Sequence, residues 1–143
     1  MVNANDRRVA AYGSGPRSTG TLYYQLGEHR LRQLIEAFYD IIEHDALGAR
    51  LLRLHKLGHG VAHSRAEQFN FLSGFLGGPS LYAQKYGHTN VREMHAHVEI
   101  DEQAKNDWLS CMGKAMDQVG LTDPLRSELM RHFTIVANVL VNR

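Results

Sequence analysis

The stretch DEQAKNDWLSCMGKAMDQVGLTDPLRSELMRHFTIVANVL, residues 101–140, decides the fold class because it contains the two clearest helical patterns of the chain. Asp101 can cap a helix that ends at Gly120, and Asp123-Pro124 opens another, with proline at its first helical position. Apolar residues recur in both with the period of a helix that buries one face. They are Ala104, Trp108, Met112, Ala115, Met116 and Val119 in the first helix and Leu125, Leu129, Phe133, Val136 and Leu140 in the second.

Helical periodicity continues upstream as far as Thr21, which can cap a short helix. The segment His29–Glu43 follows, with an apolar stripe at Leu31, Leu34, Ile35, Phe38 and Ile42. Ser64 and Glu67 have the spacing of a capping box at the start of a further helix. That helix stops at Gly77-Gly78-Pro79, because glycine and proline end helices.

Other segments lack this regularity. We expect loose structure around Gly48 and residues 55–60, irregular structure at residues 80–90, and a short helix from Val91 to His97. No segment shows the sustained alternation of apolar and polar residues that is typical of strands, so the sequence predicts an all-α domain over residues 21–143. Residues 1–20 are small and polar without apolar periodicity, which predicts a flexible N-terminal extension.

Composition limits the class of protein. The 143 residues suit one domain, and 43 % apolar residues suffice for a packed core. A formal net charge of +1 argues against nucleic-acid or membrane-surface partners, which favour a basic face. The single cysteine, together with the lack of an apolar run or signal peptide, predicts a cytoplasmic protein. Nine histidines are many for this length, and histidine is the commonest metal ligand.

An ordered set of motifs carries a resemblance to a known family. The motifs are Phe38-Tyr39, Gly77-Gly78-Pro79 followed by Tyr82, Gly87-His88, Arg92 with His95, and Trp108 with Cys111-Met112. In this order the chain resembles the group II truncated haemoglobins, from about Thr21 to Asn142. The resemblance implies a globin-like two-over-two helical sandwich that encloses haem b.

The resemblance makes His95 the proximal iron ligand. A neutral imidazole suits ferrous iron and leaves the sixth position open. His97 is the competing candidate, but two residues apart on a helix point in nearly opposite directions, so we interpret His97 as a surface residue. The resemblance also places Tyr82 and Arg92 near the haem edge and its propionates. The alternative is that Tyr82 is an ordinary half-buried core tyrosine and Arg92 an exposed surface arginine. Phe71 and Leu72 are expected to pack on the ring, and Ser64 takes the small-residue position beside the ligand route.

On the opposite, distal side, the resemblance points Tyr39 and Trp108 at the bound ligand. Without a haem, each would be a core aromatic residue. His55 either donates to the ligand or to Tyr39, or is a loop histidine. Gln68 stands where the family usually has leucine, so it either adds polar groups to the pocket or turns outward. Glu67 stands where the family often has a lysine or arginine that binds a haem propionate, so that ion pair is in doubt. Gly27-Glu28 replaces the Gly-Gly pair that usually follows the first helix of the family.

Fixed donors in a dry pocket stabilise the charge that develops on iron-bound oxygen. This predicts tight oxygen binding, with O2, CO, NO or peroxide as possible ligands. It also predicts a redox role, either NO dioxygenation or peroxidase-like chemistry, in which a reductase supplies electrons. The alternatives are a gas sensor or electron-transfer module without turnover, and a helical protein with no cofactor. The sequence leaves monomer and homodimer open.

Overall fold

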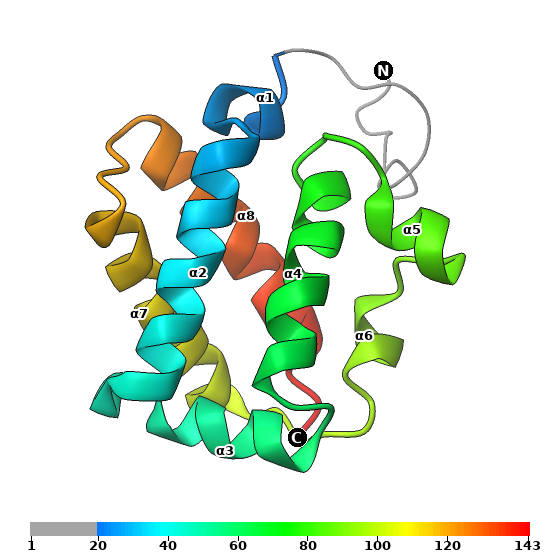
Figure 1. Ribbon diagram of the computed structural model, residues 1–143. Coiled ribbons are helices and arrows are strands. Elements are labelled where there is room, and N and C mark those ends of the chain that lie inside the picture. Colours follow the sequence, from blue (N-terminus) through cyan, green and yellow to red (C-terminus); the bar gives the residue numbers. More distant parts are fainter. Residues whose placement is uncertain (1–19) are drawn as a thin grey trace.

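The computed structural model describes residues 20–143, and within that range every regular element is a helix (Figure 1). The elements are α1 (Leu22–Leu26), α2 (Glu28–His44), the short 3-10 helix η2 (Ala46–Gly48), α3 (Ala49–Leu57), α4 (Val61–Phe75), α5 (Leu81–Tyr86), α6 (Val91–Met94), α7 (Glu102–Gln118) and α8 (Leu125–Leu140). The predicted extension at residues 1–20 lies outside the described residues, apart from exposed Gly20. No helix of the described chain has the length and apolar character that crossing a membrane requires.

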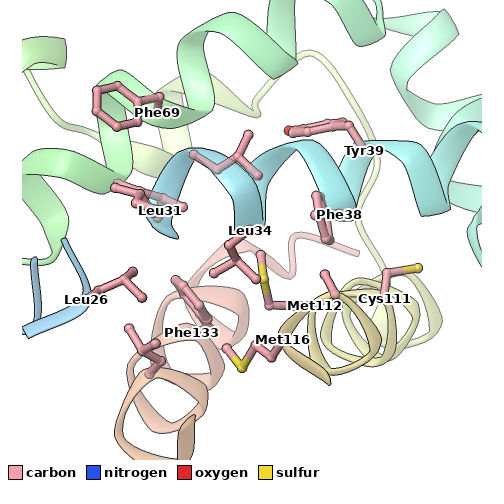
Figure 2. Packing of buried hydrophobic residues seen from close by; sticks show 14 of the residues in the cluster. Leu26, Leu31, Leu34, Phe38, Tyr39, Phe69, Cys111, Met112, Met116 and Phe133 are labelled. Atoms are coloured by element: carbon pink, nitrogen blue, oxygen red, sulfur yellow. The ribbon is translucent and has the colours of Figure 1, made fainter. Parts of the chain in front are cut away.

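The four long helices form two packed pairs. Helices α2 and α4 lie side by side, α7 packs against α8, and α2 crosses onto α7 (Figure 1). This is the predicted two-over-two arrangement. Figure 2 shows the layer between the pairs, where Leu34 and Phe38 of α2 point toward Met112 and Met116 of α7 and Phe133 of α8. All five side chains are fully buried, so the apolar stripes predicted from the sequence form the core.

The Gly77-Gly78-Pro79 corner holds α1 over the end of α4. A Cβ atom on Gly78 would lie 2.3 Å from the ring of Tyr23, so only glycine allows this approach. The Tyr23 amide donates to the Leu76 carbonyl over 2.9 Å, and the Ser73 hydroxyl donates to the Pro79 carbonyl over 2.6 Å. The corner therefore fixes where α4 ends and where the chain turns toward α5.

Two segments expected to be loose or irregular are helical. Residues 49–57 form α3, because Leu51 is buried and Leu54 packs against the core. Residues 81–86 form α5, which ends where Gly87 adopts the left-handed conformation with φ +81° and donates to the Ala83 carbonyl. Tertiary packing of one apolar face gives these short helices a stability that their local sequence does not indicate.

Two predicted helix starts are displaced. Helix α4 begins at Val61 with Gly60 at its N-cap, so Ser64 lies inside the helix and the predicted capping box does not form. Helix α8 begins at Leu125, which leaves Pro124 at the N-cap, while the Asp123 carboxylate accepts from the amide of Ser127. The start of α7 is as predicted, because the Asp101 carboxylate accepts from the amide of Ala104 over 2.8 Å.

Candidate functional site

A cavity of about 480 Å³ opens between the two helix pairs and the segment that carries α5 and α6. Its walls include nine of the ten residues predicted for the site: Tyr39, His55, Ser64, Gln68, Phe71, Leu72, Tyr82, His95 and Trp108. Arg92 is the exception, because it is exposed on α6 and is not part of the wall. Apolar side chains form much of the remaining lining, among them Met94 and, from α8, Val136 and Leu140.

His95 directly follows α6 and presents one ring nitrogen to the cavity. Its Nδ1 lies 2.8 Å from the carbonyl oxygen of Val91, and a carbonyl only accepts, so Nδ1 carries the proton. The Nε2 atom is therefore left with a lone pair. Burial lowers the pKa of His95 despite that hydrogen bond, and the positive charges of protonated His97 and His55 would lower it further. A neutral imidazole with an anchored Nδ1–H is the form that binds a metal.

On α2, Tyr39 is 2 % exposed and its hydroxyl donates to Oε1 of Gln68 on α4 over 3.2 Å. Gln68 therefore turns inward, which resolves the alternative left open by the sequence. Burial raises the pKa of Tyr39 well above its ordinary value, although Arg65 acts in the opposite direction. The phenol consequently keeps its proton at neutral pH and remains a hydrogen-bond donor.

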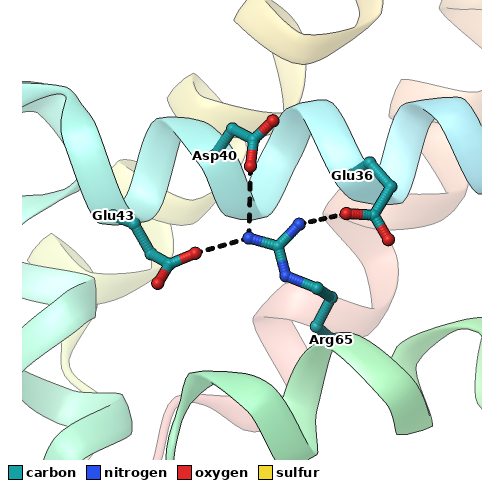
Figure 3. Close-up of polar contacts among 4 residues, drawn as sticks. All are labelled: Glu36, Asp40, Glu43 and Arg65. Carbon is teal, nitrogen blue, oxygen red and sulfur yellow. Dashed lines mark hydrogen bonds and ion pairs between the residues drawn. The ribbon is translucent and has the colours of Figure 1, made fainter.

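Arg65 fixes the position of this pair by linking α4 to α2. Its guanidinium binds three carboxylates that follow one another along α2, those of Glu36, Asp40 and Glu43 (Figure 3). The same guanidinium carbon lies 5.7 Å from the centre of the Tyr39 ring. Because an arginine fork binds several oxygens at once, this contact holds the two helices in register beside the hydrogen bond between Tyr39 and Gln68.

His55 lies in the last turn of α3, and its ring stands perpendicular to that of Tyr39 with 5.7 Å between the centres. Its Nδ1 lies 2.8 Å from the Leu51 carbonyl, so the neutral ring again carries its proton on Nδ1. Burial lowers the pKa of His55 despite this hydrogen bond. In this tautomer the Nε2 atom of His55 accepts a hydrogen bond and does not donate one.

Trp108 of α7 forms the wall beside Phe38 and Phe133, with ring centres 5.2 and 5.6 Å away. No acceptor among residues 20–143 receives the indole N–H of Trp108. A partly buried donor without a partner is uncommon, and it is typical of a site that completes its hydrogen bonds with a ligand.

One end of the cavity is polar. Glu67 of α4 binds Lys85 and accepts from the Tyr86 hydroxyl over 2.7 Å and from the Asn70 amide over 3.0 Å. Partial burial alone would raise the pKa of Glu67, but these donors lower it to about 2. Glu67 thus joins α4 to α5, the helix that leads to the His95 segment. Tyr82 stacks near Tyr86, with 4.5 Å between the ring centres.

Sequence reasoning did not single out several residues of the wall. His59, His63 and His97 are exposed around its mouth, with ring centres 4.6 Å apart for His59 and His97 and 5.1 Å for His59 and His63. His97 is a surface residue, as interpreted, but it also borders the cavity. The spacing of His59 and His63, four residues apart, was a signal that they share a face.

The cavity fits a haem. Its inner walls are apolar, as a porphyrin ring requires, and His95 presents an unprotonated nitrogen with its other nitrogen anchored. Polar groups gather at the mouth of the cavity and around Glu67. The indole N–H of Trp108 and the Tyr39–Gln68 pair add polar groups to the wall.

Comparison with known proteins gives the same result. The family described as bacterial-like globin matches residues 21–142. The group 2 truncated hemoglobin YjbI of Bacillus subtilis is 32 % identical over 121 residues, which cover 85 % of this chain and 88 % of that protein. This chain belongs to the group 2 truncated haemoglobins of the bacterial-like globin family.

Solved structures of other truncated haemoglobins have the same fold. The cold-adapted truncated hemoglobin of the Antarctic bacterium Pseudoalteromonas haloplanktis superposes with a TM-score of 0.78 at 34 % identity, covering 86 % of this chain and 98 % of that one. The truncated oxygen-avid haemoglobin of Bacillus subtilis superposes with a TM-score of 0.75 at 32 % identity, covering 86 % and 100 %. Globin membership implies a haem cofactor and haem-based binding of small gases such as oxygen.

Proposed function

We propose that this truncated haemoglobin binds oxygen tightly at haem b, with His95 as the iron ligand and Tyr39 and Trp108 as hydrogen-bond donors to the bound gas. One observation carries the proposal. The Nε2 lone pair of His95 shares a cavity with a buried phenol and with an indole N–H that has no acceptor among the described residues. Phe71 and Leu72 would pack on the ring, Ser64 would border the ligand route, and Tyr82 and Arg92 would serve the ring's carboxylates.

A bound haem would supply reversible coordination of oxygen, with partial negative charge on the gas. Trp108 would donate to the gas without giving up another hydrogen bond. Tyr39 would donate after its hydroxyl rotates away from Gln68. Trp108 is held before the ligand arrives and would stabilise the charge without reorganisation, whereas Tyr39 would first give up its hydrogen bond to Gln68. A hydrogen bond to a charged acceptor contributes about 1.5–3 kcal/mol, so two such bonds favour slow oxygen release over delivery.

Slow release suits turnover better than transport. In NO dioxygenation, oxygen and nitric oxide combine with one electron to give nitrate, so a reductase must return that electron after each cycle. Tyr39 and Trp108 would retain oxygen until nitric oxide enters the cavity. A second candidate, peroxide turnover, is favoured by one specific observation. His55 has an unprotonated Nε2 in the cavity wall, which is the form that accepts a proton from a bound acid such as hydrogen peroxide.

The donor proposal is tested by ligand dissociation from the ferrous protein. Trp108→Phe and Tyr39→Phe should each speed oxygen dissociation roughly 10- to 100-fold, because each removes a hydrogen bond of about 1.5–3 kcal/mol. Carbon monoxide carries much less charge, so its dissociation should change little. Stopped-flow measurement of both gases provides the comparison, with His63→Ala at the cavity mouth as a matched control. Equal acceleration of both gases would contradict the donor role.

Nitric oxide turnover is tested separately, by mixing the oxygen-bound wild type with nitric oxide in the stopped-flow instrument. Nitrate should form much faster than oxygen dissociates. Nitrate formation that is limited to the oxygen dissociation rate would reject dioxygenation and leave tight oxygen binding intact.

A further inference from the structure

Two histidines of this chain have the same local arrangement on different elements. His55 in α3 and His95 after α6 each place Nδ1 2.8 Å from the carbonyl oxygen four residues earlier. The carbonyl fixes the proton on Nδ1, so each ring keeps a lone pair on Nε2. For His95 this is the arrangement of an iron ligand. His55 has the same chemistry, and the function proposed above gives it no ligand role.

Position separates His55 from the other histidines. His55 and His95 line the same cavity and interact with one another electrostatically, so they are close in space. His132 of α8 makes the same backbone contact, with Nδ1 2.9 Å from the Glu128 carbonyl, but it is not part of the cavity wall. His59 and His63 line the cavity but are exposed at its mouth. The backbone contact and a partly buried place in the wall thus coincide in His55 and His95.

The Nε2 atom of His55 also lacks a donor. The Tyr39 hydroxyl is directed at Gln68, and no donor among residues 20–143 reaches Nε2 of His55. A shielded nitrogen acceptor without a partner is costly unless something binds it. Helix α3 ends at Leu57 with Gly58 at its C-cap, and Gly60 follows with φ +92°, so two glycines lie in the turn after the helix that carries His55.

Building on the proposed function, we propose that His55 binds the haem iron through Nε2 as a reversible sixth ligand when no gas is bound. The resting ferric protein then has two imidazole ligands, one from α3 and one from the segment after α6. His55 leaves the iron when an external ligand arrives and remains in the distal wall as an acceptor. The atoms involved are a nitrogen lone pair and the iron, so no proton or electron is transferred.

Absorption and electron paramagnetic resonance spectra of the ferric, haem-loaded protein test this directly. The wild type should be low-spin, and His55→Ala should become high-spin with water as sixth ligand. His55→Gln keeps a polar side chain of similar length and should also be high-spin, which covers the case in which the alanine variant folds poorly. Added imidazole should return His55→Ala to the low-spin form. His59→Ala and His63→Ala should keep the wild-type spectrum.

Azide binding provides a second readout. Because azide must displace His55, it should bind the ferric wild type at least about tenfold more slowly than His55→Ala. A high-spin wild type, or a low-spin spectrum that persists in both His55 variants, would overturn the inference. These outcomes differ from failure of the proposed function, because a protein that takes up no hemin would lose both, whereas high-spin haem with slow oxygen release would remove only the sixth ligand.

Discussion

The proposed function gives the proton of the Tyr39 hydroxyl two competing acceptors, the amide oxygen of Gln68 and a gas bound to haem iron. The structure directs it to Gln68 over 3.2 Å. Trp108 has no such competitor among the described residues. At the scale of single residues, the proposed function therefore makes Gln68 the residue that would set how strongly Tyr39 acts on the ligand.

Gln68→Leu should release the Tyr39 hydroxyl for the ligand. A neutral hydrogen bond is worth about 1 kcal/mol, so we expect oxygen dissociation to slow by roughly fivefold. Flash photolysis or stopped-flow kinetics measures the rate, and Gln84→Leu, on α5 outside the cavity wall, is the control. Faster oxygen release from Gln68→Leu would mean that the amide itself supports the ligand.

At the scale of elements, ion pairs between helices position the site. Arg65 joins α4 to α2 beside Tyr39, and Glu67 joins α4 to α5 ahead of the His95 segment. Both residues lie on α4, close to Gln68 in sequence. One helix therefore aligns the distal wall with one neighbour and the proximal segment with another.

Arg65→Met should reduce the free energy of unfolding by about 1 kcal/mol, the value of a partly exposed ion-pair network. It should also speed oxygen dissociation, because Tyr39 loses the contact that fixes its helix. Lys114→Met is the matched control, since Lys114 binds Asp45 away from the cavity wall. Denaturant unfolding and oxygen kinetics are measured on both variants. An equal change of the oxygen rate in the two would contradict a positioning role for Arg65.

The Glu67 link predicts a specific acid sensitivity. The pKa of Glu67 falls from an ordinary 4.5 to about 2 in the folded protein, so its ionised form stabilises the fold fully above pH 4.5. This contribution is lost as the pH drops from 4.5 toward 2. Glu67→Gln should thus be less stable than wild type at pH 7, with the difference shrinking below pH 4.5. Chemical unfolding at several pH values measures it, and a difference independent of pH would reject the explanation.

For the whole molecule, apolar periodicity predicted an all-helical domain, and the resemblance to truncated haemoglobins supplied the two-over-two arrangement. Local sequence signals did not place every helix. The stripes of α2, α7 and α8 are long, and they predicted both the helices and the side chains that form the core. Helix α3 was missed because it has only nine residues and ends at a glycine-rich turn. Its stability comes from packing of its leucines, which the local sequence does not reveal. The capping box at Ser64 failed because Gly60 starts α4 earlier.

The site shows the same division. Tyr39, His55, His95 and Trp108 lie far apart in the sequence but line the same cavity. Contacts between residues on different helices could not be predicted from the sequence. Neither the Tyr39–Gln68 hydrogen bond nor the contact of Arg65 with three carboxylates corresponds to a sequence spacing. The proton position on His55 also required the structure, because it depends on the distance to the Leu51 carbonyl.

The most direct test of the central claim is hemin titration of the purified wild type, His95→Ala and His97→Ala, followed by absorption spectroscopy. The wild type and His97→Ala should each take up one equivalent tightly and show a nitrogen-ligated haem spectrum. His95→Ala should retain hemin poorly. A wild type that stays colourless with hemin, or a His95→Ala variant that binds it as the wild type does, would contradict the claim that His95 holds the haem iron.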